Sequence, residues 1–186
     1  LDQDMIHLGT FGYVDVRTKL TDVILEAAGW LTQWGHQVAL HVIGSASSDQ
    51  ETELRERARE LDLAHFNVTG FQTEEQFRDW LLAVDLGVQL RVSPLLGVSG
   101  PLSDLAAFGT PAVASRGLCE DVQAPPYIRA LPDAVSPVTV AEAIERALIE
   151  PIPEAELEML RQDYLRRMAP GAYASQLMQI LERAIG

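Results

Sequence analysis

The stretch LRVSPLLGVSGPLSDLAAFGTPAVAS, residues 90–115, predicts the end of a strand, a loop, a helix and a second strand. The helix begins at Ser99, a residue type that caps helix N-termini well, and Pro101 fits the first helical turn. Gly100 has no side chain to block an approaching group. Because the first backbone N–H groups of a helix have no partner within it, this start is suited to an anion. Ordinary helix capping explains the same residues without a ligand.

Strands and helices alternate outward from this stretch in both directions. Apolar runs predict strands over residues 5–10, 38–43, 66–69, 86–90, 111–115 and 127–131. Apolar residues at helical spacing, together with capping signals, predict helices over residues 20–34, 50–61, 73–84, 99–108, 139–150, 154–168 and 173–185. The alternation predicts an α/β fold, a Rossmann-like doubly wound parallel sheet of about six strands in the order 3-2-1-4-5-6.

The acidic composition narrows the classes of function. Lys and Arg total 14 against 27 Asp and Glu, a net charge of -13, so the field of the protein repels nucleic acid and anionic lipid surfaces. The single cysteine, Cys119, excludes an internal disulfide and fits a reducing compartment. No apolar run reaches the roughly 20 residues of a membrane-spanning helix. We therefore predict a cytoplasmic protein, and because the chain begins at Leu1 without a Met we expect a piece of a longer one.

In a sheet of this strand order, the ligand crevice lies beyond the carboxyl ends of the first and fourth strands. The loops Gly9–Lys19 and Arg91–Val98 are expected to meet there. They carry Arg17, Lys19 and Arg91, whose charges suit a pyrophosphate resting on the helix start. The alternatives are solvated surface charges offset by nearby carboxylates and, for Arg91, a structural ion pair.

Other candidate residues give weaker signals. Asp104, one turn into the same helix, is a candidate acceptor for ribose hydroxyls, with a solvated surface carboxylate as the alternative. The sequence has no phosphate-binding P-loop, G-x-G-x-x-G, H-E-x-x-H or C-x-x-C pattern, and GVSGP lacks the last glycine of a nucleophile elbow. We predict His41 as a hydrogen-bonded core residue, His7 as lying nearer the crevice, and Cys119 as a small buried residue in a loop.

Three stretches resemble the C-terminal, donor-binding half of GT-B glycosyltransferases of the retaining family 4 (group 1) type: GTFGYVDVRTKLTDVILEAA, LHVIGSAS and SGPLSDLAAFGTPAVAS. The resemblance implies a nucleotide-sugar-binding domain over residues 1–150. It implies transfer of a hexose-like sugar from a UDP- or GDP-sugar, with retention and without a metal or cofactor, to a glycan or other acceptor. The acceptor would be bound by a missing N-terminal lobe, so that the fragment alone is inactive. Helices over 151–186 would pack on the domain or on that lobe.

The resemblance also implies roles for single residues. Lys19 and Arg91 are the implied catalytic residues, because they would stabilise charge on the departing diphosphate. The implied donor-binding residues are Gly12, Arg17, Lys19, Gly70, Phe71, Arg91, Ser99, Gly100 and Asp104. Within that set, Gly70 and Phe71 would lie beside the base, and Asp104 stands in place of a ribose-binding glutamate.

The sequence departs from the family at one position. The family's E-x7-E motif begins with an acidic residue that holds the sugar hydroxyls, and here Leu96 or Gly97 stands in its place. Three readings follow: the sugar is held differently, the domain binds a nucleotide without turnover, or it is a catalytically silent interaction or regulatory domain. A nucleotide-sugar epimerase is disfavoured because the sequence carries no matching motif.

Overall fold

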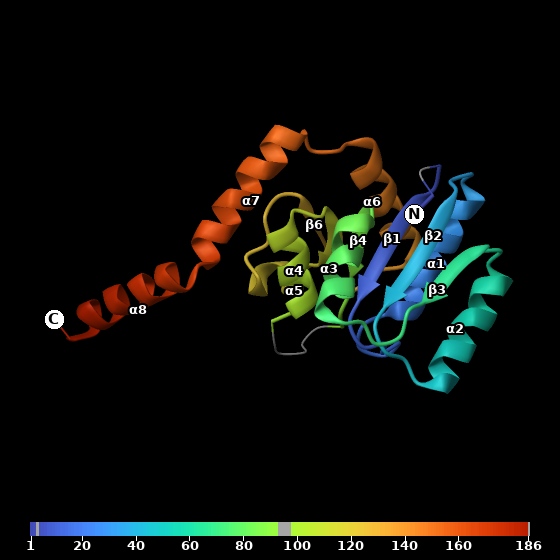
Figure 1. Cartoon of the computed structure of the whole chain (residues 1–186), viewed down its shortest axis with the longest axis horizontal. Helices are drawn as coiled ribbons and strands as arrows, with labels where there is room; N and C mark the ends of the chain where they lie inside the picture. The colour runs from blue at the N-terminus through green and yellow to red at the C-terminus, as the bar shows by residue number, and fades with distance from the viewer. Residues whose placement is uncertain (3, 93–97, 186) are drawn as a thin grey trace.

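The computed structural model describes residues 1–2, 4–92 and 98–185, which form one parallel sheet flanked by helices (Figure 1). The strands are β1 (Ile6–Phe11), β2 (Val38–Ile43), β3 (His65–Val68), β4 (Leu86–Gln89), β5 (Ala112–Ser115) and β6 (Ile128–Leu131). Their order is β3-β2-β1-β4-β5-β6, and each neighbouring pair is parallel. The predicted Rossmann-like doubly wound sheet and its strand order are confirmed.

Eight helices are formed by the described residues. They are α1 (Thr21–Gln33), α2 (Ser48–Glu60), α3 (Glu74–Ala83), α4 (Gly100–Phe108), α5 (Arg116–Asp121), α6 (Pro137–Ile149), α7 (Glu154–Met168) and α8 (Pro170–Ile185). The helices on one face of the sheet, α1, α2 and α6, share a core that includes Ile24, Leu54 and Ile144. The other face is covered by α3, α4, α5 and α7. Every residue of β2 is buried, as expected for a strand covered on both sides.

Two predictions about helices are wrong. The residues after β5 form the short helix α5 rather than a loop, because Leu118 and Cys119 turn inward and bury their side chains against the sheet. The predicted capping of α6 by Thr139 is also wrong. Ser136 is the cap, since its hydroxyl accepts the N–H of Thr139 at 3.2 Å, and Pro137 occupies the first turn. The predicted burial of Cys119 is confirmed.

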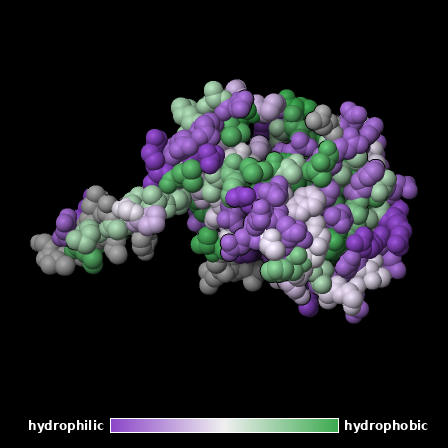
Figure 2. Space-filling view, in the orientation of Figure 1, coloured by the Kyte–Doolittle hydropathy of each residue, from purple (hydrophilic) through white to green (hydrophobic). Residues whose placement is uncertain are grey.

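The two C-terminal helices differ in how they contact the domain. Helix α7 packs on α4, where Tyr164 is buried in the core and Arg161 Nε donates to the carbonyl of Ala107 at 2.8 Å. Helix α8 extends away from the sheet as an arm (Figure 1) that carries both hydrophobic and hydrophilic residues (Figure 2). Its Met178 and Ile180 are exposed. Within the described ranges, none of the helices combines the length and apolar character that crossing a membrane requires.

Candidate functional site

The segments after β1 and β4 meet at the carboxyl edge of the sheet, as predicted. The backbone N–H of Val92 donates to the carbonyl of Thr18 at 2.9 Å, which joins the segment after β4 to the turn before α1. The end of β5 holds Arg91 as well, because Ser115 Oγ accepts the Arg91 N–H at 2.9 Å and donates to the Arg91 carbonyl at 3.2 Å. Strand β1 runs to Phe11, so the first loop begins at Gly12 rather than at Gly9.

The side chain of Lys19 crosses this edge toward the start of α4. A methyl group built on Gly12, whose φ is +100°, would lie 2.9 Å from Lys19 Nζ and 3.4 Å from Cγ of Pro101. The loop before α2 lies against the loop after β1, since a methyl group on Gly44 would lie 2.1 Å from the carbonyl oxygen of Gly12. Glycine is therefore required at both positions, where the loops from β1 and β2 touch backbone to backbone and leave room for the ammonium.

Lys19 and Arg91 act on each other electrostatically. The pKa of Lys19 is lowered from its ordinary value, first by burial and then by the positive charge of Arg91, while Asp15 opposes the shift. The positive charges of Lys19 and Arg91 repel one another. An anion bound between them relieves that repulsion, so the arrangement favours a negatively charged ligand.

Helix α4 begins at this edge with its first turn accessible. Ser99 is 3% exposed, and its hydroxyl accepts the N–H of Leu102 at 3.3 Å, which confirms the predicted N-cap. The carbonyl of Ser99 accepts the Ser103 hydroxyl at 3.0 Å. Gly100 is exposed, and a methyl group built on it would meet no atom of residues 1–2, 4–92 or 98–185 within 4 Å. Among the described residues, none fills the space beside Gly100 at the helix start.

A groove lies between α3 and α4. It has a volume of about 1020 Å³, and its walls include Phe71, Phe77, Asp104 and Phe108. Phe71 projects from the loop after β3 and is 83% exposed. Asp104 is partly buried, and that burial raises the pKa of its carboxyl group. The groove thus joins an aromatic ring to a carboxylate, two groups expected to contact a base and a ribose.

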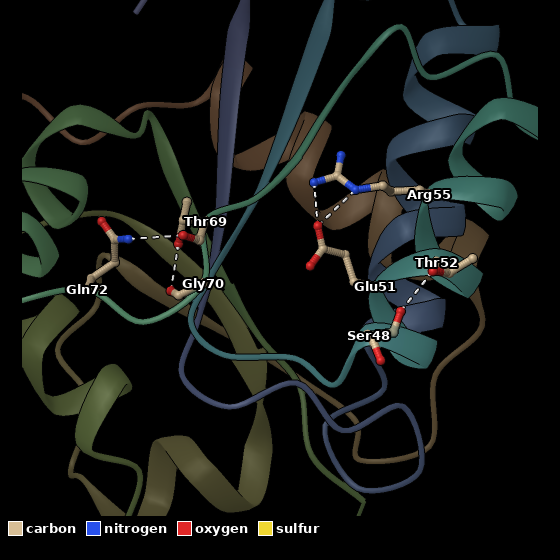
Figure 3. Close-up of polar contacts among 7 residues, drawn as sticks. All are labelled: Ser48, Glu51, Thr52, Arg55, Thr69, Gly70 and Gln72. Atoms are coloured by element: carbon tan, nitrogen blue, oxygen red, sulfur yellow. Dashed lines mark hydrogen bonds and ion pairs between the residues drawn. The ribbon is translucent and has the colours of Figure 1, made fainter.

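The loop that carries Gly70 and Phe71 is held by short polar contacts. Gln72 Nε2 donates to the carbonyl of Thr69 at 3.2 Å, and the Thr69 hydroxyl donates to the carbonyl of Gly70 at 3.1 Å (Figure 3). The N–H of Gly44 reaches the same hydroxyl at 3.3 Å. These contacts fix the loop while leaving the space around Gly70 open.

Not every predicted site residue reaches the edge in this way. Arg17 is exposed, and the charges that act on the pKa of Lys19 are those of Arg91 and Asp15. The prediction that His7 lies nearer the crevice is wrong, because it is the second residue of β1 and so belongs to the amino edge of the sheet. Leu96 and Gly97 lie outside the described residues. In the described part of the chain, no three His, Cys, Asp or Glu side chains are grouped to hold a metal ion.

Sequence reasoning missed three residues at this edge. Asp15 forms the turn that leads to Lys19, and an Asp followed by Thr three residues later is a recognisable turn signal. Ser115 holds the backbone of Arg91, which no local pattern indicates. Leu20 has a φ of +52°, a left-handed conformation that costs a non-glycine residue roughly 1–2 kcal/mol. This strain lies directly beside Lys19.

The sheet order and the flanking helices define a Rossmann-like domain whose carboxyl edge carries Lys19 and Arg91. A family model of the group 1 glycosyl transferases matches residues 3–150. The chain therefore belongs to this family, as the sequence resemblance predicted. A search of curated protein sequences found no match.

Solved structures share the fold at low sequence identity. The C-terminal domain of a group 1 glycosyl transferase (LpcC) from Francisella tularensis has a TM-score of 0.69 and 20% identity, over 88% of this chain and 85% of that one. Anabaena Alr3699/HepE, solved in complex with UDP and glucose, has a TM-score of 0.74 and 16% identity. The match covers 97% of this chain but only 49% of HepE, so the present chain spans about half of that protein. Both likenesses identify the fold of the C-terminal half of GT-B glycosyltransferases.

Proposed function

We propose that this chain is the donor-binding lobe of a glycosyltransferase that uses a nucleoside-diphosphate sugar, with UDP as the nucleotide to test first. The observation that carries the proposal is the placement of Lys19 near Pro101 at the start of α4 and within electrostatic reach of Arg91. That combination matches the charge of a diphosphate. The similarity to HepE, which was solved with UDP, supports the choice of nucleotide.

The proposed chemistry is electrostatic. In the transfer, the bond between the anomeric carbon and the β-phosphate oxygen breaks, and its electron pair leaves on the diphosphate. An acceptor oxygen forms the new bond and loses its proton. Lys19, Arg91 and the N–H groups of α4 would stabilise the growing charge on the departing diphosphate, which lowers the barrier only if they are already in place.

The groove between α3 and α4 would hold the nucleoside. Phe71 offers an exposed ring for stacking against a base. Asp104 offers an acceptor for ribose hydroxyls one turn below the phosphates. The acceptor, a glycan or another molecule, would bind to a second lobe. Three further statements stay predictions from the sequence: that the transfer retains the configuration of the sugar, that the chain alone is inactive, and that the protein is cytoplasmic.

Binding of UDP to the 186-residue chain, measured by calorimetry, tests the proposal. We expect saturable binding that Lys19→Ala and Arg91→Ala each weaken about tenfold or more, because each removes a charged partner of the diphosphate. Arg55→Ala is the matched control. It removes a guanidinium that pairs with Glu51 at 2.7 Å on α2 (Figure 3), so UDP affinity should stay unchanged.

The catalytically silent domain is the second candidate, favoured by the apolar residues that replace the first acid of the family motif. Absence of binding to UDP, GDP and their sugar conjugates at millimolar concentration would select it. Loss of affinity in all three variants, including the control, would also contradict the proposed site.

A further inference from the structure

The turn that carries Lys19 is held by a single carboxylate. Asp15 Oδ1 accepts the backbone N–H groups of Arg17 at 3.0 Å and Thr18 at 3.2 Å, and Oδ2 accepts the Thr18 hydroxyl at 2.6 Å. The carbonyl of Asp15 accepts the N–H of Lys19 at 2.8 Å. Four hydrogen bonds from one residue therefore set the path of the backbone up to Lys19.

The same turn positions the second cation. The carbonyl of Thr18, whose N–H and hydroxyl are both bonded to Asp15, accepts the N–H of Val92 at 2.9 Å. Val92 follows Arg91 directly. One backbone hydrogen bond thus joins the turn to the segment that carries Arg91, whose own backbone also bonds to Ser115.

Asp15 also changes the charge balance at Lys19. Burial and Arg91 lower the pKa of Lys19, and Asp15 raises it. Hydrogen bonding, above all from the Thr18 hydroxyl, lowers the pKa of Asp15 itself, so its carboxylate is ionised at neutral pH. Among the described residues, the groups that face Lys19 are Arg91 from the β4 side, Asp15 from its own turn, and the start of α4 near Pro101.

We propose that Asp15 is a positioning residue of the donor site, which sets the places of Lys19 and Arg91 and holds a carboxylate near the Lys19 ammonium. The inference rests on the proposed function, since it assigns Asp15 a role toward the same diphosphate. Asp15 acts through the two cations and through the backbone. It would not touch the ligand.

Lys19 is the only lysine of the sequence, which allows a direct test. Lysine labelled with ¹³C at Cε gives one side-chain signal, whose shift against pH reports the protonation of Lys19. Asp15→Asn keeps the shape and one acceptor oxygen but removes the charge. We expect the titration midpoint of Lys19 to fall in this variant. Asp22→Asn, the same change at an exposed position on α1, should leave the midpoint in place.

UDP affinity supplies the second readout. We expect Asp15→Asn to weaken UDP binding about tenfold and to move the loss of binding at high pH to a lower pH, because the deprotonated amine no longer attracts phosphate. In a Lys19→Arg background that shift with pH should vanish, since a guanidinium does not titrate in this range. The titration of UDP itself is common to all the proteins. Thermal unfolding of each variant is recorded alongside.

The outcomes separate the inference from the function on which it rests. The inference is overturned if the titration midpoint of Lys19 is the same in the wild-type chain and in Asp15→Asn. It is also overturned if the midpoint falls as far in Asp22→Asn as in Asp15→Asn. In either case, UDP binding by the wild-type chain would still support the proposed function. An affinity loss of equal size and pH profile in the Lys19→Arg background shows a structural role alone and also overturns it. If the wild-type chain does not bind UDP, both fail together.

Discussion

His41 is a buried residue whose ionisation bears directly on stability. It is 9% exposed, its ring lies 4.8 Å from that of Trp80, and its Nε2 lies 3.1 Å from Nδ1 of His7. Because the carbonyl oxygen of Asp2 lies 2.7 Å from His7 Nε2, that nitrogen donates, and the His7 Nδ1 is left to accept from His41 Nε2. His41 Nδ1 is then an acceptor, and no donor among the described residues forms a hydrogen bond to it. The predicted hydrogen-bonded core histidine is confirmed.

This arrangement predicts a loss of stability in acid. Burial, followed by the electrostatic effect of His7, lowers the pKa of His41 from 6.5 to about 4. Between pH 6.5 and pH 4, His41 is therefore protonated in the unfolded chain but largely unprotonated in the folded chain. The free energy of unfolding should fall as pH falls from 6.5 toward 4, by roughly 2–3 kcal/mol from this residue. Urea unfolding at pH 7 and pH 4.5 measures it.

The control for this prediction compares two histidine variants. His41→Leu should reduce the fall in stability, because it removes the titrating ring, whereas His65→Asn, at an exposed position on β3, should not. Carboxylates that titrate in the same window are common to all three proteins. Equal acid sensitivity in the wild type and His41→Leu would contradict the assignment.

At the scale of elements, the same capping chemistry begins several helices. Ser47 caps α2, Thr73 caps α3, Ser99 caps α4 and Ser136 caps α6. The capping pattern alone therefore does not single out a binding helix. Helix α4 differs because Lys19, in the turn between β1 and α1, lies near its first turn. Strand β1 pairs with β4 at the switch point of the sheet.

Two cap variants separate helix stability from ligand binding. Ser99→Ala and Ser47→Ala should each lower the free energy of unfolding by about 1 kcal/mol, since each frees a helix N–H. Only Ser99→Ala should also weaken UDP binding, because it loosens the turn proposed to receive the phosphate. Calorimetric titration and chemical unfolding of both variants test this. Equal UDP affinities in the two variants would count against α4 as the phosphate helix.

At the scale of the whole molecule, α7 belongs to the folded domain while α8 extends from it (Figure 1). Tyr164 of α7 is 3% exposed, and it packs in the same core as Leu102 and Leu105 of α4. The predicted division at residue 150 would cut α7 from this core.

Two truncations test this division. A chain ending at Ala169 should keep its free energy of unfolding within about 1 kcal/mol, because the described side chains of α8 are largely exposed. A chain ending at Glu150 should lose several kcal/mol, since the face of α4 beneath Tyr164 becomes exposed to water. Urea unfolding of both chains provides the comparison. Equal stability of the two truncated chains would show that α7 does not stabilise the domain.

The sequence by itself determined the alternation of strands and helices, the strand order, the family and the cap at Ser99. The strands, the helices and the cap depend on local patterns that each segment carries in its own residues. The strand order depends in addition on the short, right-handed connections that are general to parallel sheets. The residues themselves indicated Arg17, Lys19, Arg91 and Asp104, and the resemblance to the family added Gly12, Gly70 and Phe71 to the candidates. It could not rank them, because local patterns do not say which side chains approach one another.

Only the tertiary structure decided which cations lie together. Lys19 and Arg91 lie within electrostatic reach of each other, while Arg17 on the same loop is exposed. The structure also decided the left-handed Leu20 and the bond from Thr18 to Val92. These features arise where segments distant in sequence pack at one edge of the sheet, and their energies exist only once that packing is formed.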